Sequence, residues 1–367
     1  MNYQTRQKKL SASLDRHRLD GLLVTHLPNI RYLCGFTGSS AALLLSVRGS
    51  VLFTDGRYAA QASDEVSRAK VEIRRTPPLE SAAEWMGENR KRLGWRTGKP
   101  FKLAIEAEHV SAASHDRLRQ ALPSLCRTSK TSMLVENLRA VKDEKEIAGL
   151  RAAVMLGSRL FDVVLRATSA GRMETQVAAE LEYAARLQGA EGMSFPSIVA
   201  AGKRSALPHG VASMAEIPSR GFVVCDFGVI LSGYCSDMTR TVHLGRPTTE
   251  ARRVYESVLA AQLAAIATVK DGVSVCEVDE AARKLLQKRG LGPYFTHSTG
   301  HGVGLEIHEA PRIAADRTET LRAGMVITIE PGVYIPGNFG VRIEDMVVVT
   351  KGGCEVLTPT SKELIVL

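Results

Sequence analysis

The second half of the chain contains five residues with the types and setting of a metal-binding site. They lie among glycines and short apolar runs typical of β-strands: Asp226, Asp237, His301, Glu330 and Glu344. Carboxylates gathered on apolar strands repel one another and lose hydration, so they persist only when protonated or bound to cations. An oxygen-rich ligand set with one imidazole favours Mn, Co, Fe or Mg over structural zinc, which prefers sulfur and nitrogen.

The two aspartates lie on a predicted β-hairpin. Two runs rich in Val, Phe, Ile, Leu, Tyr and Thr flank a Ser-Gly dipeptide, which is typical of a two-residue turn. Pairing Leu231 with Tyr234 across this turn fixes the register of the hairpin. Asp226 then faces Thr239, and Asp237 becomes the diagonal neighbour of Asp226 on the same face. Two carboxylates in this relation can reach one cation or bracket a pair.

The two glutamates lie on a second predicted hairpin. A loop centred on Gly337 places Glu330 directly across from Glu344. The two hairpins also resemble each other, since DFGV, GY and DM in the first correspond to EPGV, GV and EDM in the second. This weak internal repeat predicts two similar half-domains that each give one acid pair to a shared centre.

The same five residues carry a resemblance to a known family. With their flanks they resemble the metal ligands of the pita-bread metallopeptidases and, within that superfamily, the Xaa-Pro peptidases, namely aminopeptidase P and prolidase. The match is strong over about residues 135–367 and rests on these flanking motifs: Pro208-His209-Gly210, Gly300-His301-Gly302-Val303-Gly304, His308-Glu309, Glu330-Pro331-Gly332 and Gly340-Val341-Arg342-Ile343-Glu344-Asp345.

This resemblance implies a dinuclear centre and a reaction. The expected cofactors are two divalent metal ions, Mn²⁺ or Co²⁺ first, with Zn²⁺ and Fe²⁺ as alternatives. The expected activity is hydrolysis of Xaa-Pro bonds at the N-terminus of small peptides, by a hydroxide that bridges the two ions. Two other functions stay open: a creatinase-like C–N hydrolase on the same fold, and a non-catalytic relative that binds peptides or nucleic acid.

The resemblance also assigns roles to three side chains. Glu330 is implied as both a ligand and the acid/base that carries the proton from the attacking water to the leaving amine. His209 and His308 resemble the two histidines of the superfamily that are not ligands, one binding substrate and one at the oxyanion. The alternative for each histidine is a capped or solvent-facing side chain.

Four further residues are candidates for the surroundings of the centre. Arg342 shares a strand face with Glu344, so we expect it to pair with Asp237 or another carboxylate. His297 fits a pocket role and a structural role equally well. Tyr334 and Phe195 fit the lining of an apolar proline pocket or the plain core.

The order of predicted elements indicates two domains of an α/β (α+β) protein. Residues 1–130 alternate short strands and helices and resemble the creatinase-type N-terminal domain. Residues 123–136 are polar and lack a clear helical period, which indicates a boundary, and the resemblance implies that residues 131–367 are the pita-bread catalytic domain. This second domain is expected to begin with one long helix over 137–171.

Composition narrows the class of partner. The net charge of +9 is concentrated in the first 130 residues, but without aromatic interleaving, so we expect a solvated surface and no nucleic acid. No apolar run approaches the ~20 residues that span a bilayer, which predicts no membrane association. Six cysteines without a paired spacing indicate reduced thiols and the cytoplasm. The expected partners are small proline-containing peptides, and the resemblance implies a homodimer.

Overall fold

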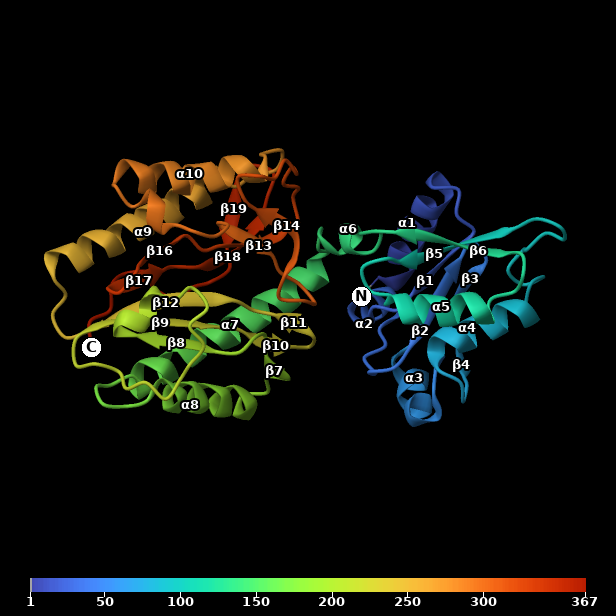
Figure 1. Cartoon of the computed structure of the whole chain (residues 1–367), viewed down its shortest axis with the longest axis horizontal. Helices are drawn as coiled ribbons and strands as arrows, with labels where there is room; N and C mark the ends of the chain where they lie inside the picture. Colours follow the sequence, from blue (N-terminus) through green and yellow to red (C-terminus); the bar gives the residue numbers. More distant parts are fainter. Residues whose placement is uncertain (1) are drawn as a thin grey trace. The chain divides into compact units, whose positions relative to one another are not determined.

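The computed structural model of the protein describes residues 2–367, and the chain divides after Arg139 into two compact units (Figure 1). Within these residues, no helix has both the length and the apolar character to cross a membrane. Each unit has its own core, and the fold is mixed α/β in both.

The first unit is built on one six-stranded sheet with the order β4-β3-β2-β1-β5-β6. Its strands are β1 (Gly21–Val24), β2 (Ala42–Ser46), β3 (Gly49–Thr54), β4 (Lys70–Ile73), β5 (Phe101–Glu106) and β6 (Cys126–Thr131). Its helices are α1 (Tyr3–Arg16), α2 (Leu27–Cys34), α3 (Ala59–Glu65), α4 (Pro78–Glu88), α5 (Ala112–Ala121) and α6 (Glu136–Arg139). Every residue of β1 and β2 is buried, so both faces of the sheet centre are covered.

Strand β6 lies in the polar stretch at which the sequence predicts the domain boundary, and no strand was predicted there. The strand pairs in parallel with β5 and forms an edge of the sheet. Its sequence CRTSKT has few apolar residues because only one side of an edge strand is paired and much of its surface meets solvent.

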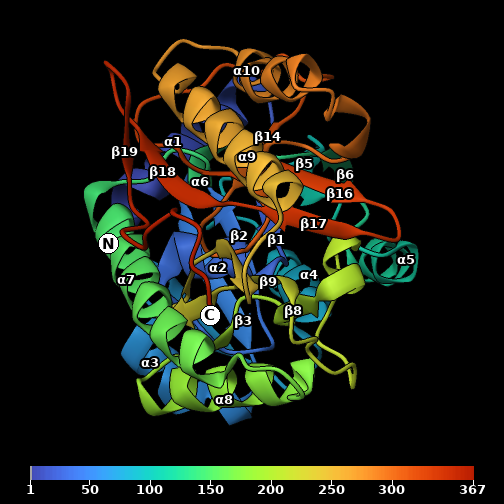
Figure 2. The ribbon, with the colours of Figure 1, turned by 90° about the vertical axis from the view of Figure 1, so that its left-hand side faces the viewer.

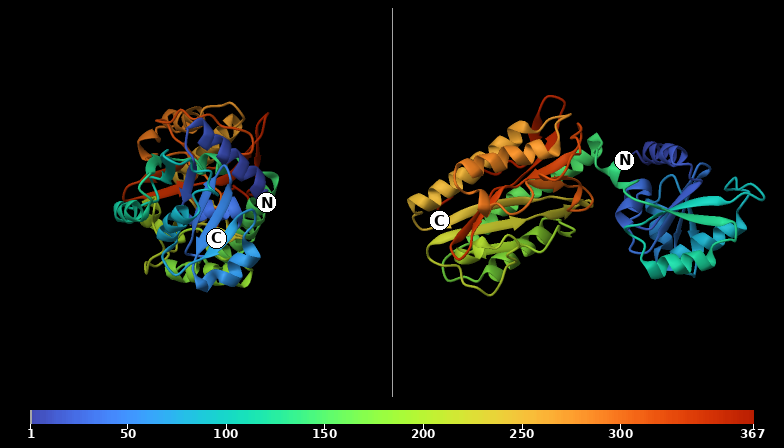
Figure 3. Two further views of the ribbon diagram at one scale, coloured as in Figure 1. Left: turned by 90° about the vertical axis from the view of Figure 1, so that its right-hand side faces the viewer. Right: turned by 45° about the horizontal axis from the view of Figure 1, so that its top comes forward.

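The second unit places two layers of strands between two pairs of helices (Figures 2 and 3). The helices are α7 (Glu144–Ala167), α8 (Glu174–Leu187), α9 (Thr249–Thr268) and α10 (Val275–Lys288). The first-half strands are β7 (Gly192–Met193), β8 (Ile198–Ala201), β9 (Gly221–Phe227), β10 (Val229–Leu231), β11 (Tyr234–Cys235) and β12 (Met238–Leu244). The second-half strands are β13 (Gly300–Gly302), β14 (Glu309–Ile313), β15 (Val326–Ile329), β16 (Gly332–Ile335), β17 (Phe339–Arg342), β18 (Asp345–Val349) and β19 (Cys354–Val356).

The two halves of this unit repeat one order of elements, a helix pair followed by strands. Helices α7 and α8 pack with β8, β9 and β12 around one apolar core, which includes Leu160, Val223 and Val242. Helices α9 and α10 pack with β15 to β18 around a second core, which includes Val258 and Ile327. The predicted repeat of half-domains is therefore present in the element order.

The long helix predicted over 137–171 is interrupted, so that prediction was wrong in one detail. Helix α6 ends at Arg139, and α7 starts at Glu144. The side chain of Asp143 accepts the N–H of Glu146, and the Glu146 carboxylate accepts the N–H of Asp143, both at 3.0 Å. This reciprocal cap starts a new helix, because its two bonds satisfy N–H groups that have no partner within the first turn.

Both predicted hairpin registers are confirmed. Leu231 pairs with Tyr234, and Asp226 pairs with Thr239, although the hairpin is divided into β10–β11 and β9–β12. In the second hairpin, pairing around the turn at Gly337 continues from β16–β17 into β15–β18 in one register. The strands are interrupted at Asp237, Glu330 and Glu344, whereas Asp226 lies within β9 and is paired on both sides.

Candidate metal centre

The five predicted ligands come from three places in the second unit. Asp226 is in β9, and Asp237 lies in the break between β11 and β12. His301 is the middle residue of β13. Glu330 follows β15, and Glu344 precedes β18, so both lie where the second hairpin is interrupted. The hairpins meet because Thr239 Oγ1 donates to Glu344 Oε2 at 2.8 Å.

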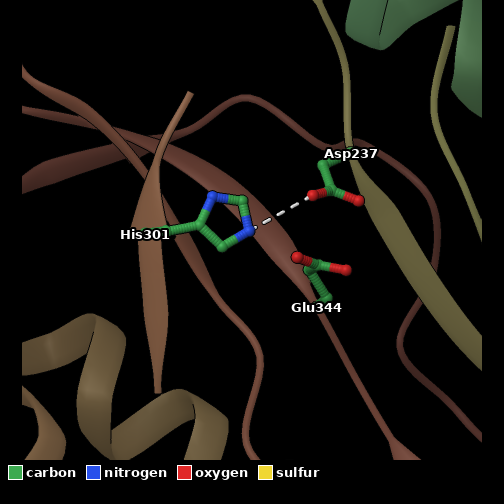
Figure 4. Close-up of side chains that lie close together, drawn as sticks. All are labelled: Asp237, His301 and Glu344. Carbon is green, nitrogen blue, oxygen red and sulfur yellow. Dashed lines mark ion pairs between the residues drawn. The ribbon is translucent and has the colours of Figure 1, made fainter. Parts of the chain in front are cut away.

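Three of these side chains converge most closely (Figure 4). Potential ligand atoms of Asp237, His301 and Glu344 all lie within 4.8 Å of one another. Glu330 adjoins them, with Oε1 at 3.6 Å from His301 Nε2, and Asp237 Oδ2 is 3.5 Å from the same nitrogen. Asp226 lies outside this closest group, although it lines the same cavity.

The imidazole of His301 is oriented as a ligand would be. Its Nδ1 lies 3.0 Å from the carbonyl oxygen of Gly302, which can only accept, so Nδ1 carries the proton. Burial lowers the pKa of His301 to about 4, and the ring is therefore neutral at pH 7. Its Nε2 lone pair then faces carboxylate oxygens of Asp237 and Glu330, an arrangement of acceptors that a cation would satisfy.

The carboxylates fit a hard divalent cation. Asp226 Oδ1, Asp237 Oδ1 and Glu344 Oε1 are buried and have no hydrogen-bond partner among the described residues. Burial, followed by the charge of Glu344, raises the pKa of Asp237 well above its usual value. Burial, followed by the charge of Glu330, does the same to Glu344. Unpaired buried carboxylate oxygens are costly unless protonated or bound to an ion.

Arg342 holds Asp226 in place. Its Nη2 donates to Asp226 Oδ2 at 2.6 Å, and its Nε donates to Thr239 Oγ1 at 3.0 Å. The expected pairing of Arg342 with a carboxylate is thus present, and the partner is Asp226, not Asp237. Since Arg342 occupies Oδ2, the unpartnered Oδ1 of Asp226 is the oxygen left for an ion.

His297 and Tyr334 form a bonded pair behind one wall. His297 Nδ1 faces the carbonyl oxygen of Ser298 at 2.7 Å, so it donates there, and Nε2 accepts from Tyr334 Oη at 3.0 Å. The hydroxyl oxygen of Tyr334 accepts in turn from Arg342 Nη1. His297 lines the cavity, whereas Tyr334 is buried and is not among the described residues that line it. The hydroxyl of Tyr334 joins His297 to Arg342, and both of these residues line the cavity.

The centre opens into a cavity of about 590 Å³, a size suited to a small peptide. The predicted residues Phe195, His209 and His308 all line it. The His308 ring meets that of His301 edge-on, with centroids 4.4 Å apart. Burial, followed by the nearby His209, lowers the pKa of His308, so its imidazole is neutral at pH 7. The apolar part of the wall includes Pro196, Ile198, Val211 and Ile307.

Sequence reasoning missed several residues that support the centre. Thr239 bridges Glu344 and Arg342, and its place opposite Asp226 in the register was the available signal. Glu309 lines the cavity and pairs with the buried Lys142 at 3.1 Å. No sequence signal joins these two, because they are 167 residues apart.

Comparison with known proteins gives matches over the whole chain. The pattern of metallopeptidase family M24 matches residues 148–351, and that of the creatinase/prolidase N-terminal domain matches residues 6–141. The Xaa-Pro dipeptidase of Pyrococcus horikoshii is 34% identical over 359 residues, 98% of each chain. The structure of an Xaa-Pro dipeptidase from Bacillus anthracis, 39% identical, matches with a TM-score of 0.94 over 100% of both chains. An X-Pro aminopeptidase from Thermotoga maritima, 35% identical, matches with a TM-score of 0.88 over 97% of this chain and 100% of that chain.

Proposed function

Because the chain belongs to metallopeptidase family M24, we propose that it hydrolyses Xaa-Pro bonds at the N-terminus of small peptides with divalent metal ions. It has the pita-bread catalytic fold of this family and a creatinase-type N-terminal domain. The observation that carries the proposal is the convergence of Asp237, His301 and Glu344 within 4.8 Å in the lining of a peptide-sized cavity.

The proposed ligands of two divalent ions are Asp226, Asp237, His301, Glu330 and Glu344. The unpartnered buried oxygens of three of these acids support this assignment, and the oxygen-rich donor set favours Mn²⁺ or Co²⁺ over Zn²⁺. When bound, such ions lower the pKa of a water molecule and polarise the carbonyl of the scissile bond.

Glu330 is the proposed acid/base residue. Burial is the main cause that raises its pKa from 4.5 to about 7, against the opposing charge of Arg342. A carboxylate with a pKa near the working pH both accepts and returns a proton readily. Glu330 therefore takes the proton of the attacking water and delivers it to the proline nitrogen, which otherwise leaves as an unstable amide anion.

The histidines place the substrate. His308 is neutral at pH 7 and lines the cavity beside His301, so an N–H of its ring can donate to the oxyanion that forms at the scissile carbonyl. His209 lines the same cavity and is the proposed second contact with the substrate backbone. His297 has both nitrogens bonded within the protein, so it serves as a fixed wall. Phe195 and its apolar neighbours offer the surface for a proline ring.

Metal-dependent hydrolysis of two peptides tests the proposal. The chelator-treated protein is assayed on Ala-Pro and on Arg-Pro-Pro, alone and with Mn²⁺, Co²⁺, Zn²⁺ or Fe²⁺. We expect hydrolysis only after an ion is added, most strongly with Mn²⁺ or Co²⁺. Comparing the two peptides separates dipeptidase from aminopeptidase preference. Absence of hydrolysis with every ion would refute the proposal.

A matched pair of variants locates the reaction. Asp237→Asn keeps size and removes one proposed ligand charge, so hydrolysis is expected to be lost together with Mn²⁺ binding measured by calorimetry. Asp316→Asn changes an exposed aspartate of the same unit and is expected to retain both. Full activity of Asp237→Asn would exclude this site as the reaction centre.

We also propose a homodimer that works in the cytoplasm. The dimer rests on the family resemblance, and light scattering after size-exclusion chromatography tests it. The compartment is supported by the six cysteines, all of which are unpaired thiols, as expected where disulfides are kept reduced. Localisation of a tagged protein by cell fractionation tests the compartment.

A further inference from the structure

An ion pair on α10, between a buried aspartate and a partly exposed arginine, supports the segment that leads to the centre. Asp279 is fully buried and receives Arg283 at both oxygens, Nε to Oδ2 and Nη2 to Oδ1, each at 2.8 Å. Thr299 Oγ1 donates to Asp279 Oδ1 at 2.8 Å as well. The charge of Asp279 is therefore satisfied inside the protein, which a buried carboxylate requires.

The remaining donors of Arg283 reach the backbone beside the cavity. Nη1 donates to the carbonyl oxygen of Phe295 at 3.1 Å, and Nη2 donates to that of His297 at 3.0 Å. The guanidinium also lies over the Phe295 ring, 4.2 Å from its centroid. A planar guanidinium can bind a carboxylate and two carbonyls at once, whereas an ammonium group cannot match that geometry.

The network continues through Thr299 to Glu330. The carbonyl oxygen of Thr299 accepts the backbone N–H of Glu330 at 2.8 Å, while its own N–H donates to Ile313 at 2.9 Å. Thr299 therefore connects a side-chain bond from Asp279 with a main-chain bond to the proposed acid/base residue. His301 follows only two residues later.

We infer that Asp279 and Arg283 are positioning residues for this centre: Arg283 fixes the His297 wall, and Asp279 fixes Glu330 through Thr299. Neither side chain is among the described residues that line the cavity, so each acts through another residue. Disturbing Arg283 displaces the surface against which the substrate packs, which weakens substrate binding. Disturbing the Thr299 hydroxyl displaces the group that moves the proton, which slows turnover.

The neighbouring ion pair on α10 provides a matched control. Lys284 pairs with Glu280 at 2.7 Å with the same i,i+4 spacing, but both side chains are more than half exposed. The variants are Arg283→Lys, which keeps the charge, Thr299→Val, which keeps the shape, and Lys284→Met. Lys284→Met removes an ion pair of the same helix that the centre does not use.

Steady-state kinetics give the first test, and this part rests on the proposed function. Arg283→Lys is expected to raise KM about tenfold with kcat within about twofold, the size typical of residues behind a metal site. Thr299→Val is expected to lower kcat about tenfold with KM within about twofold. A loss of folded protein lowers the apparent kcat and leaves KM unchanged, so the raised KM of Arg283→Lys distinguishes positioning from simple destabilisation. For Thr299→Val, kcat is expressed per folded protein, measured by circular dichroism, so that its fall reports slower turnover and not unfolding. Lys284→Met is expected to match the wild type.

Amide hydrogen exchange of the metal-free protein gives a second test that needs no activity. Exchange over residues 295–300 is expected to be faster in Arg283→Lys and Thr299→Val, and unchanged in Lys284→Met. If the wild type proves inactive while these rates differ as expected, the proposed function fails and the positioning network stands. Wild-type exchange rates in both variants would overturn the inference, as would a wild-type KM for Arg283→Lys in an active enzyme.

Discussion

Replacing Glu330 by glutamine separates two effects of this residue: the destabilisation of the metal-free protein by its buried charge, and its role in hydrolysis. Without an ion, burial raises the pKa of Glu330 from 4.5 to about 7. A group whose pKa is raised on folding stabilises the folded state at pH values below its unfolded-state pKa. This stabilisation is lost as the pH rises through its folded-state pKa. At ~1.4 kcal/mol per pKa unit, the ionised carboxylate costs the metal-free protein roughly 3 kcal/mol at pH 8 and almost nothing at pH 4.5.

Glu330→Gln is therefore expected to stabilise the metal-free protein at pH 8 while abolishing hydrolysis. The gain of about 3 kcal/mol corresponds to roughly 6–12 °C in the unfolding midpoint of a domain of this size. It should shrink toward zero by pH 4.5, where the wild-type carboxyl is protonated in the folded state and already about half protonated in the unfolded state. With Mn²⁺ added at pH 8, the order should reverse, because the wild type has one more ligand.

Thermal unfolding at several pH values, with and without Mn²⁺, measures these differences. Glu174→Gln is the control, since Glu174 is also a buried glutamate of this unit but pairs with Arg204 at 3.0 Å. Its substitution breaks a satisfied ion pair, so it should destabilise the protein at pH 8. The reasoning is refuted if Glu330→Gln gives no gain at pH 8, or gives the same gain at pH 4.5.

Two further substitutions test the surroundings of the site. Tyr334→Phe removes the hydroxyl that joins Arg342 to His297. Steady-state kinetics should show a KM raised up to about tenfold, which corresponds to the free energy of one hydrogen bond. An unchanged KM would contradict the role of His297 as a fixed wall. Lys142→Met leaves the buried Glu309 carboxylate without its ion-pair partner. Denaturant unfolding should show that the free energy of unfolding falls by about 3–5 kcal/mol, and adding Glu309→Gln should largely restore it. A fall below about 1 kcal/mol would count against a buried charge pair.

The sequence predicted the strand pairing well because the register of each hairpin is fixed by the position of its turn and by the alternation of side chains between the two faces of a strand. The Ser-Gly turn sets the pairing of Asp226 with Thr239, and the Gly337 turn sets the second register. Elements that depend on tertiary context were less predictable. Strand β6 has a polar sequence and exists because β5 offers it a backbone edge. The interruption before α7 depends on the reciprocal cap at Asp143, which competes with continued helix.

The types of residue at the site could be predicted, but their partners mostly could not. Nothing in the sequence says that Arg342 binds Asp226 in preference to Asp237, since both lie on one hairpin face. The spacing of Asp279 and Arg283 is that of a surface pair on a helix. The burial of Asp279 and the hydrogen bond from Arg283 to the loop follow only from the packing of α10. The type of each ligand can therefore be predicted from the sequence, whereas the hydrogen bonds that orient it depend on the folded structure.

The meeting of the two hairpins has a consequence for the durability of the chain. Thr239 and Glu344, joined by a hydrogen bond, are 105 residues apart. An ion held between Asp237 and Glu344 would act as a reversible cross-link that closes a loop of similar length, restricting partly open states much as a covalent bridge does. Loss of the metal would then make the protein more susceptible to proteolysis as well as inactive.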